Sequence, residues 1–237
     1  MSLYRFCKNE NLPMVELLLK FGADPNEENY KQKRPLYAAR FNVGLTQLLV
    51  DYGANVNLPV YKDMVPLHFA CYFNNIDMAR VLLENGAFPM MIDEEGNTPL
   101  FMSCFNYEMT KLLLEYGAIV HIHEFAYACQ HAPLEVVELL SMYVIDINEM
   151  DSGLTPLDVA LLSNRIDVVR VLIKNGADIN KIDELDWTPL DTACFYSNVD
   201  IIEFLIKNGA KITTEAFQCD RNEVISLLNR VSSTVLE

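Results

Sequence analysis

The 237-residue sequence is poor in glycine, in basic residues and in long apolar runs. Its nine glycines leave little room for a phosphate-binding loop, and neither a nucleophile elbow nor a catalytic Cys–His signature is present. No apolar run reaches the roughly 18 residues that indicate a membrane-spanning helix. Charged residues near the start stand where a secretory signal would have an apolar block. We therefore expect no catalytic residues and a cytoplasmic setting, either in the producing cell or in a host cell.

Basic residues are outnumbered, because 18 Lys and Arg stand against 33 Asp and Glu, a formal net charge of −15. Nucleic-acid binding depends on cationic side chains that neutralise phosphates, so nucleic acid is not an expected partner. Anionic membrane surfaces are disfavoured for the same reason. Long-range electrostatics instead favours a basic segment of another protein. Acidity that serves only solubility is the simpler explanation, and both stay open.

What the sequence does contain is a repeat. The segments that begin at Leu154 and Trp187 both continue Thr-Pro-Leu-Asp, both end on Lys-Asn-Gly-Ala, and their glycines, Gly176 and Gly209, lie 33 residues apart. Thr before Pro caps a helix whose first turn tolerates the missing N–H of proline. Gly after the second helix supplies a left-handed C-cap. A period of this length with these two signatures resembles the ankyrin repeat family.

The resemblance implies an all-α solenoid of stacked helix-turn-helix pairs with short β-hairpin fingers, in a single domain spanning 1–237. About seven repeats and a partial C-terminal cap are expected, at 1–28, 29–59, 60–92, 93–120, 121–149, 150–182, 183–212 and 213–237. The first repeat lacks its opening turn, so the chain starts with a half-repeat cap or is a fragment of a longer array. The fifth departs furthest, with no room for a finger after Gly117 and no glycine after its second helix, 133–142.

Six cysteines invite a disulfide or metal interpretation, which their spacing opposes. Cys71, Cys104 and Cys194 each lie five residues after the proline of their repeat, and Cys7, Cys129 and Cys219 align with the same point. Neighbouring helices pack about 8–10 Å apart, whereas a disulfide needs Cα atoms within about 7 Å. We therefore expect a buried ladder of free thiols.

Histidine raises a second metal alternative. His121 and His123 followed by His131 form a candidate cluster, but no acidic or thiolate partner has zinc-site spacing. Structural or surface roles are the expectation, and no metal or other cofactor is predicted. His68 matches the histidine of the family's Thr-Pro-Leu-His signature, and the resemblance implies a hydrogen bond between neighbouring turns.

The resemblance also implies that first helices and finger tips line a concave face that binds partners. Aromatic residues occur at matching positions of several repeats, and acidic residues occur on the fingers, including 27–28, 93–95, Glu149 and Asp151. Rings packed between repeats are the alternative, above all for Phe41 and Phe105. The predicted partner-binding residues, with side chains outside the stacked core, are Phe41, Tyr72, Phe73, Phe105, Tyr107, Trp187, Phe195, Tyr196, Asp183, Glu184 and Asp186.

The resulting hypothesis is a non-catalytic, monomeric module that binds another protein, favouring one with a basic segment, in its concave groove. The first alternative is the targeting or substrate-recognition part of a larger microbial or viral effector or enzyme whose other domains lie outside this chain. A scaffold or inhibitor that competes for another repeat protein's partner is the second alternative.

Overall fold

A computed structural model describes residues 2–235, in which contacts concentrate into two compact units, with the chain boundary between Ile119 and Val120. The outermost repeat limits expected from the sequence, residues 1 and 237, lie outside the described part. Each unit consists of helix pairs, and no helix within the described residues is both long enough and apolar enough to cross a membrane.

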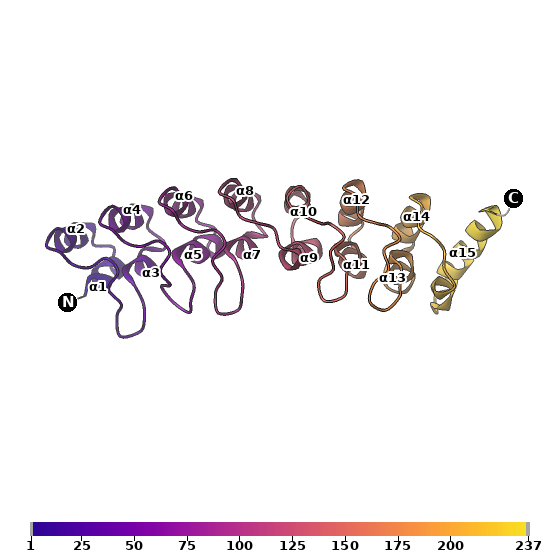
Figure 1. Ribbon diagram of the computed structural model, residues 1–237, viewed down its shortest axis with the longest axis horizontal. Helices are drawn as coiled ribbons and strands as arrows, with labels where there is room; N and C mark the ends of the chain where they lie inside the picture. The colour runs from indigo at the N-terminus through magenta and orange to yellow at the C-terminus, as the bar shows by residue number, and fades with distance from the viewer. Residues whose placement is uncertain (1, 236–237) are drawn as a thin grey trace. The chain divides into compact units, whose positions relative to one another are not determined.

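Unit 1, which ends at Ile119, contains four helix pairs. The odd-numbered, inner helices form one layer, the even-numbered, outer helices form a second, and finger loops project from the inner layer (Figure 1). Within the layers α1 packs on α3, α5 on α7, and α6 on both α4 and α8. The helices are α1 Leu3–Lys8, α2 Leu12–Lys20, α3 Pro35–Ala39, α4 Val43–Asp51, α5 Pro66–Tyr72, α6 Ile76–Glu84, α7 Pro99–Ser103 and α8 Tyr107–Glu115.

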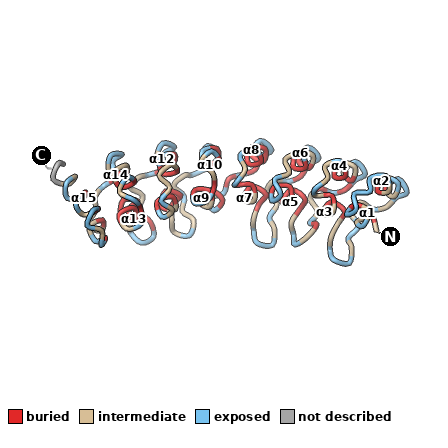
Figure 2. Tube along the Cα trace, turned by 180° about the vertical axis from the view of Figure 1, so that it is seen from behind, coloured by how far each residue is buried: buried red, intermediate tan, exposed pale blue. Residues whose placement is uncertain are grey.

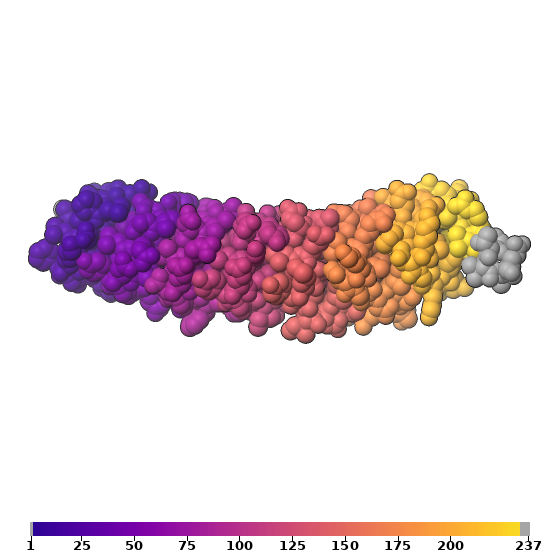
Figure 3. Space-filling view, turned by 90° about the horizontal axis from the view of Figure 1, so that it is seen from above, coloured from indigo at the N-terminus to yellow at the C-terminus, as the bar shows by residue number. Residues whose placement is uncertain are grey.

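Unit 2, which starts at Val120, repeats the same layering. Inner helix α11 packs on α9 and α13, and outer helix α10 packs on α12. Within each unit the surface runs through the colour scale in chain order, as expected when each repeat contacts its neighbours (Figure 3). The helices are α9 Ile122–His131, α10 Leu134–Ser141, α11 Pro156–Leu162, α12 Ile166–Lys174, α13 Pro189–Tyr196, α14 Val199–Lys207, the 3₁₀ helix η1 Glu215–Gln218 and α15 Asn222–Val235.

The fingers are turns rather than paired strands. Their β pairing within residues 2–235 consists of two isolated bridges, Tyr61 with Met64 and Asp151 with Leu154. No finger separates α8 from α9, which confirms the shortened fifth repeat. The corresponding segment before the C-terminal cap forms only the single 3₁₀ turn η1, not a full inner helix. Fingers are mostly exposed, whereas the facing sides of the helices are buried (Figure 2).

The Gly-Ala pair after each regular outer helix ends that helix by a left-handed turn. Gly53 has φ 89°, its N–H donates to Val50 O at 2.9 Å, and the N–H of Ala54 donates to Leu49 O at 2.9 Å. These two bonds satisfy carbonyls that the helix end leaves without partners. Outer helix α10 ends differently, because both Tyr143 and Val144 donate to Leu140 O without a glycine. The sequence-based cap assignment is confirmed.

Asparagine side chains link successive repeats within each unit. Asn57 Nδ2 donates to Gly86 O at 2.9 Å, and its Oδ1 accepts the N–H of Phe88 at 2.8 Å. Asn26, Asn148 and Asn180 make the same pair of bonds to the following repeat. The equivalent residue of the third repeat is Met90, whose sulfur accepts only the N–H of Ile119, at 3.1 Å. This link therefore lacks the bond to a carbonyl.

The cores of both units are apolar and include all six thiols. In unit 1 Leu3, Leu36, Leu45 and Leu49 belong to one buried cluster that also contains Cys7. All six cysteines are buried and free, which confirms the expected burial. Burial raises the pKa of Cys7, Cys129 and Cys194 from about 9 to about 12. Such thiols remain protonated at neutral pH and act as small apolar side chains.

Candidate functional site

The acidic finger residues divide into structural and exposed side chains. Asp183 Oδ1 accepts the N–H groups of Leu185 and Trp187 at 2.8 and 2.9 Å, which holds the finger turn closed. Asp183 is only 7% exposed, so the expectation of a surface carboxylate is wrong for this residue. Glu184 and Asp186 are exposed as expected. The turn chemistry, in which an Asp side chain accepts nearby N–H groups, explains the burial of Asp183.

Asp93 in unit 1 plays the same part. Its Oδ1 accepts the N–H groups of Glu95 and Asn97, both at 2.9 Å, and it is half-buried. The next two carboxylates, Glu94 and Glu95, are exposed at the tip of the finger. Each of these two fingers therefore combines one Asp that shapes the turn with acidic side chains in contact with solvent.

Unit 1 displays three of the predicted aromatic residues together. Phe41 and Tyr72 are 58% and 66% exposed, and each has its ring beside that of Phe73, with centroids 4.7 and 5.0 Å apart and steep interplanar angles. Phe41 comes from the second repeat and Phe73 from the third, so the ring contact crosses a repeat boundary. The ring of Phe41 packs on a neighbouring repeat, as one alternative proposed, and remains largely exposed. Its part in partner binding stays a prediction.

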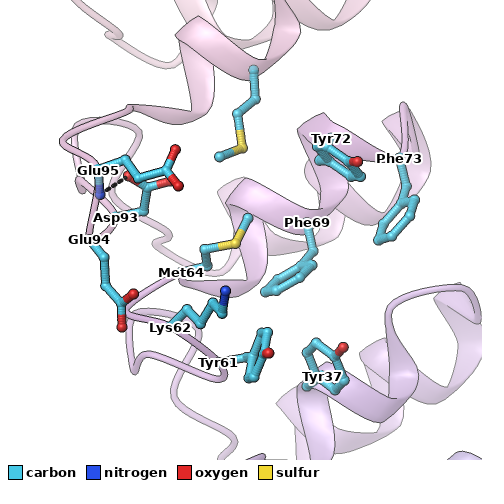
Figure 4. A pocket seen from close by; sticks show the side chains of 11 residues that line it. Tyr37, Tyr61, Lys62, Met64, Phe69, Tyr72, Phe73, Asp93, Glu94 and Glu95 are labelled. Atoms are coloured by element: carbon cyan, nitrogen blue, oxygen red, sulfur yellow. Dashed lines mark hydrogen bonds between the residues drawn. The ribbon is translucent and has the colours of Figure 1, made fainter.

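Beside these rings lies a cavity of about 380 Å³, named here the aromatic–acidic cavity. Figure 4 shows the carboxylates of 93–95 on one side, the rings of Phe69 and Tyr72 on the other, and Met64 with Lys62 between them. Its walls come from the inner helices and fingers of the second to fourth repeats. The lining residues are Tyr37, Tyr61, Lys62, Met64, Phe69, Tyr72, Phe73, Asp93, Glu94, Glu95 and Met102.

Sequence reasoning missed most of the cavity wall. Tyr37 contacts both Tyr61 and Phe69, with ring centroids 5.5 and 5.1 Å away. Phe69 lies on the inner helix α5, one turn before Phe73, and is itself buried. Two other predicted residues, Phe105 and Tyr107, are exposed but do not line this cavity. Tyr107 opens the outer helix α8.

Unit 2 holds the second predicted aromatic group. Trp187 stacks on Phe195 with centroids 4.8 Å apart, and Tyr196 is 59% exposed beside them. Trp187 and Phe195 are half-buried. The expectation that all three rings stand outside the packed structure therefore holds only for Tyr196, because the finger folds Trp187 back onto α13.

Polar contacts between repeats position the fingers. His68 Nδ1 accepts the N–H of Val65 at 3.2 Å, and Nε2 lies 3.0 Å from Asn97 O in the next finger. Nδ1 accepts a hydrogen bond, so Nε2 carries the proton and donates it to that carbonyl. Burial lowers the pKa of His68, which favours the neutral imidazole. The hydrogen bond between neighbouring turns that the resemblance implies for His68 is present.

Aspartate takes the equivalent position in unit 2. Asp158 Oδ2 accepts the N–H and hydroxyl of Thr155, while Oδ1 is buried without a hydrogen-bond partner. Burial raises the pKa of the Asp158 carboxyl. The hydrogen bonds from Thr155 act in the opposite direction, and the charge of Asp183 adds to the increase. Asp191 differs because the hydroxyl of Thr213 donates to its Oδ1. Neither carboxyl faces the exposed surface.

The remaining histidines are exposed, as expected. His123 Nδ1 lies 3.2 Å from Asp151 Oδ2, while His121 and His131 stand at the two ends of α9. No group of three or more His, Cys, Asp or Glu side chains within the described residues has an arrangement that could hold a metal ion.

Helix pairs, finger turns and Gly-Ala caps together define a repeat protein. Models of the ankyrin repeat match residues 3–30, 36–124 and 125–216, so the chain belongs to the ankyrin repeat family. The human ASB11 ankyrin repeat domain superposes with a TM-score of 0.72 at 20% identity, covering 90% of this chain and 100% of that one. The ankyrin repeat domain of Bcl-3, described as a unique member of the IκB protein family, gives 0.73 at 26% identity, covering 87% and 98%.

Curated relatives are larger than this chain. Human transient receptor potential cation channel subfamily A member 1 is 26% identical over 183 residues, 75% of this chain and 15% of that protein. The mouse B-cell lymphoma 3 protein homolog is 29% identical over 129 residues, 48% of this chain and 28% of that protein. The chain therefore spans a small part of the length of both relatives.

Proposed function

We propose that this chain is a non-catalytic recognition module that binds a partner protein through the inner helices and fingers of unit 1. The observation that carries the proposal is the exposed ring cluster of Phe41, Tyr72 and Phe73 beside the aromatic–acidic cavity. Aromatic side chains concentrated in one patch are typical of interface hot spots. The net charge of −15 favours a protein over nucleic acid or an anionic membrane. The proposal includes a monomer in a cytoplasmic setting.

The partner assay uses the full chain as bait in a pull-down, with proteins identified by mass spectrometry and affinities measured for the purified pair. Tyr72→Ala should weaken binding by about 30-fold, because truncating a desolvated ring costs about 2 kcal/mol. Phe21→Ala is the control, since Phe21 is 83% exposed at the end of outer helix α2. Equal affinities of wild type and Tyr72→Ala for every purified partner would contradict the proposal.

A second candidate is the recognition part of a larger protein, such as an effector or an enzyme. The larger size of the curated relatives supports it. The sequence of the full transcript distinguishes the two, since a further domain in the same reading frame would favour the second candidate.

A further inference from the structure

The basic residues of this acidic chain are concentrated near its start. Residues 1–40 hold seven of the 18 Lys and Arg but only five of the 33 Asp and Glu. The first repeat and the following finger are therefore slightly positive, whereas the remainder of the chain is strongly negative. The function proposed above rests on the net negative charge of the whole chain and not on this asymmetry.

Four of these basic residues line one cavity of about 500 Å³, named here the basic cavity. Arg5 and Lys8 reach it from α1, and Lys31 and Lys33 reach it from the first finger. Two carboxylates also line it, and one of them, Glu28, forms an ion pair with Arg34 at 2.9 Å. Within the described residues none of the four cations lies in an ion pair.

The basic cavity adjoins the aromatic–acidic cavity. Lys33 lines the basic cavity, and its ammonium lies 4.3 and 4.4 Å from the ring centroids of Tyr37 and Tyr61. Those two rings line the aromatic–acidic cavity. Lys33 of the basic cavity therefore packs on two rings of the aromatic–acidic cavity, and all three side chains belong to unit 1.

The two cavities have opposite charge. The basic cavity contains four cationic and two anionic side chains, whereas the aromatic–acidic cavity contains one cation, Lys62, and three carboxylates. In the aromatic–acidic cavity the carboxylate of Asp93 accepts hydrogen bonds from its own finger turn. Glu94 and Glu95 are the carboxylates at the exposed rim. Rings and methionines below the rim suit the methylene stem of a long basic side chain, whose charged head would reach the carboxylates.

We propose that unit 1 binds an extended segment of a partner protein with an ordered pair of charges. A Lys or Arg side chain enters the aromatic–acidic cavity, and an Asp or Glu side chain meets Arg5, Lys8 and Lys31 at the basic cavity. The order of the two charges fixes the direction in which the segment lies, since reversal would bring like charges together. This inference rests on the proposed function and adds the chemistry of the partner and its orientation.

The test uses a displayed library of random 12-residue peptides selected on the full 237-residue chain. We expect the enriched peptides to share one Lys or Arg and one Asp or Glu at a fixed spacing. The strongest peptide is then synthesised, and its Kd is measured against wild type and charge-reversed chains. Glu94→Lys with Glu95→Lys, and separately Lys8→Glu with Lys31→Glu, should each weaken binding by about tenfold or more.

Compensating changes make the test specific. Replacing the peptide's basic residue by Glu should restore binding to the Glu94→Lys, Glu95→Lys chain, as expected for direct charge pairing. Glu84→Lys with Glu115→Lys is the control, since these exposed carboxylates end outer helices α6 and α8 and should leave the Kd unchanged. Urea midpoints of all the variants should match that of wild type.

Four outcomes would overturn the inference. Enriched peptides without the charge pair, or no enrichment, would exclude recognition of such a segment. Binding that ignores the reversals but is lost in Tyr72→Ala would also exclude it, while leaving the proposed function intact. A charge-sensitive dimer of the chain alone, seen by sedimentation velocity and abolished by Glu94→Lys with Glu95→Lys, would assign the cavities to a second copy.

Discussion

The imidazole of His68 joins the third repeat to the fourth by donating a hydrogen bond from Nε2 to the carbonyl of Asn97, 3.0 Å away. The other ring nitrogen accepts from Val65, so both nitrogens are used only when the ring is neutral. Protonation would direct an N–H group at the N–H of Val65. The finger that carries Glu94 and Glu95 is therefore connected to the inner helix α5 by an imidazole that makes both hydrogen bonds only in its neutral form.

Acidification should weaken this connection. Burial lowers the pKa of His68 below its ordinary value of 6.5, so the stabilisation is present above that pH and is lost as pH falls toward the folded-state pKa. His68→Leu should lower the free energy of unfolding by about 1–3 kcal/mol at pH 7.5 and remove this part of the pH dependence. Urea titrations at pH 7.5 and 5.5, followed by circular dichroism, measure both effects. His131→Gln, an exposed histidine, is the control, and equal pH dependence in His68→Leu and wild type would contradict the prediction.

Asp158 should give the opposite dependence in unit 2. Burial raises the pKa of its carboxyl above the ordinary 3.8, so its favourable contribution is present at low pH and is lost as pH rises through the folded-state pKa. The stability of wild type relative to Asp158→Asn should therefore increase as pH is lowered from 7 toward 4. Trp187 is the single tryptophan, and its fluorescence reports unit 2 during urea unfolding. A difference that stays constant with pH would show that Asp158 does not titrate as proposed.

Thr213 should stabilise unit 2 through Asp191. Its hydroxyl donates to Asp191 Oδ1 and accepts the N–H of Ala216 at 3.2 Å. Thr213→Val leaves a buried carboxylate oxygen and an N–H group without partners and should cost about 1–3 kcal/mol. Thr214→Val, at the exposed neighbouring residue, should cost less than about 0.5 kcal/mol. Similar urea midpoints for the two variants would contradict the role assigned to Thr213.

Met90→Asn should strengthen unit 1. An asparagine here would accept the N–H of Ile119, as the methionine sulfur does, and would also donate to Gly117 O, following the pattern of Asn57. One added hydrogen bond is worth about 1 kcal/mol. Urea unfolding measures the gain, and hydrogen exchange of the Ile119 amide should slow. Faster exchange at that amide would show that the thioether contact is the better one.

The six thiols should react slowly in the native protein. Their burial and the raised pKa of Cys7, Cys129 and Cys194 leave almost no thiolate at pH 8. A chromogenic thiol reagent should therefore modify the folded chain at the rate of unfolding, and all six should titrate at once in guanidinium chloride. Rapid native reaction of even one thiol would contradict the buried ladder.

The helix pairs were predictable because their signals are local. A proline in the first turn of the inner helix and a Gly-Ala pair after the outer helix each influence only the few residues beside them. Both signals recur at a fixed period. The missing cap after α10 was predictable for the same reason. The burial of thiols at one point of the inner helix also follows directly from the period.

The site was only partly predictable, because its geometry depends on pairs of residues from different repeats. Phe41, Tyr72 and Phe73 were identified from their repeat positions. The contacts of Tyr37 with Tyr61 and Phe69 were not, since these rings come from an inner helix, a finger and the next inner helix, which only the fold brings together. Asp183 was assigned to the surface on charge alone. The Asp-x-x-x-Trp spacing was a local signal that could have predicted its turn-closing hydrogen bonds.

The residue two positions after the helix-opening proline makes the order of the repeats chemically specific. His68 requires a carbonyl acceptor in the repeat that follows it, whereas Asp191 requires a hydroxyl donor and receives it from Thr213. Exchanging these two repeats would place the carboxylate of Asp191 against the carbonyl of Asn97, and acceptor would face acceptor. Gene rearrangements that duplicate or shuffle repeats would therefore leave the fewest buried polar groups without partners where donor and acceptor still match. The repeats are therefore not chemically interchangeable, although they share one fold.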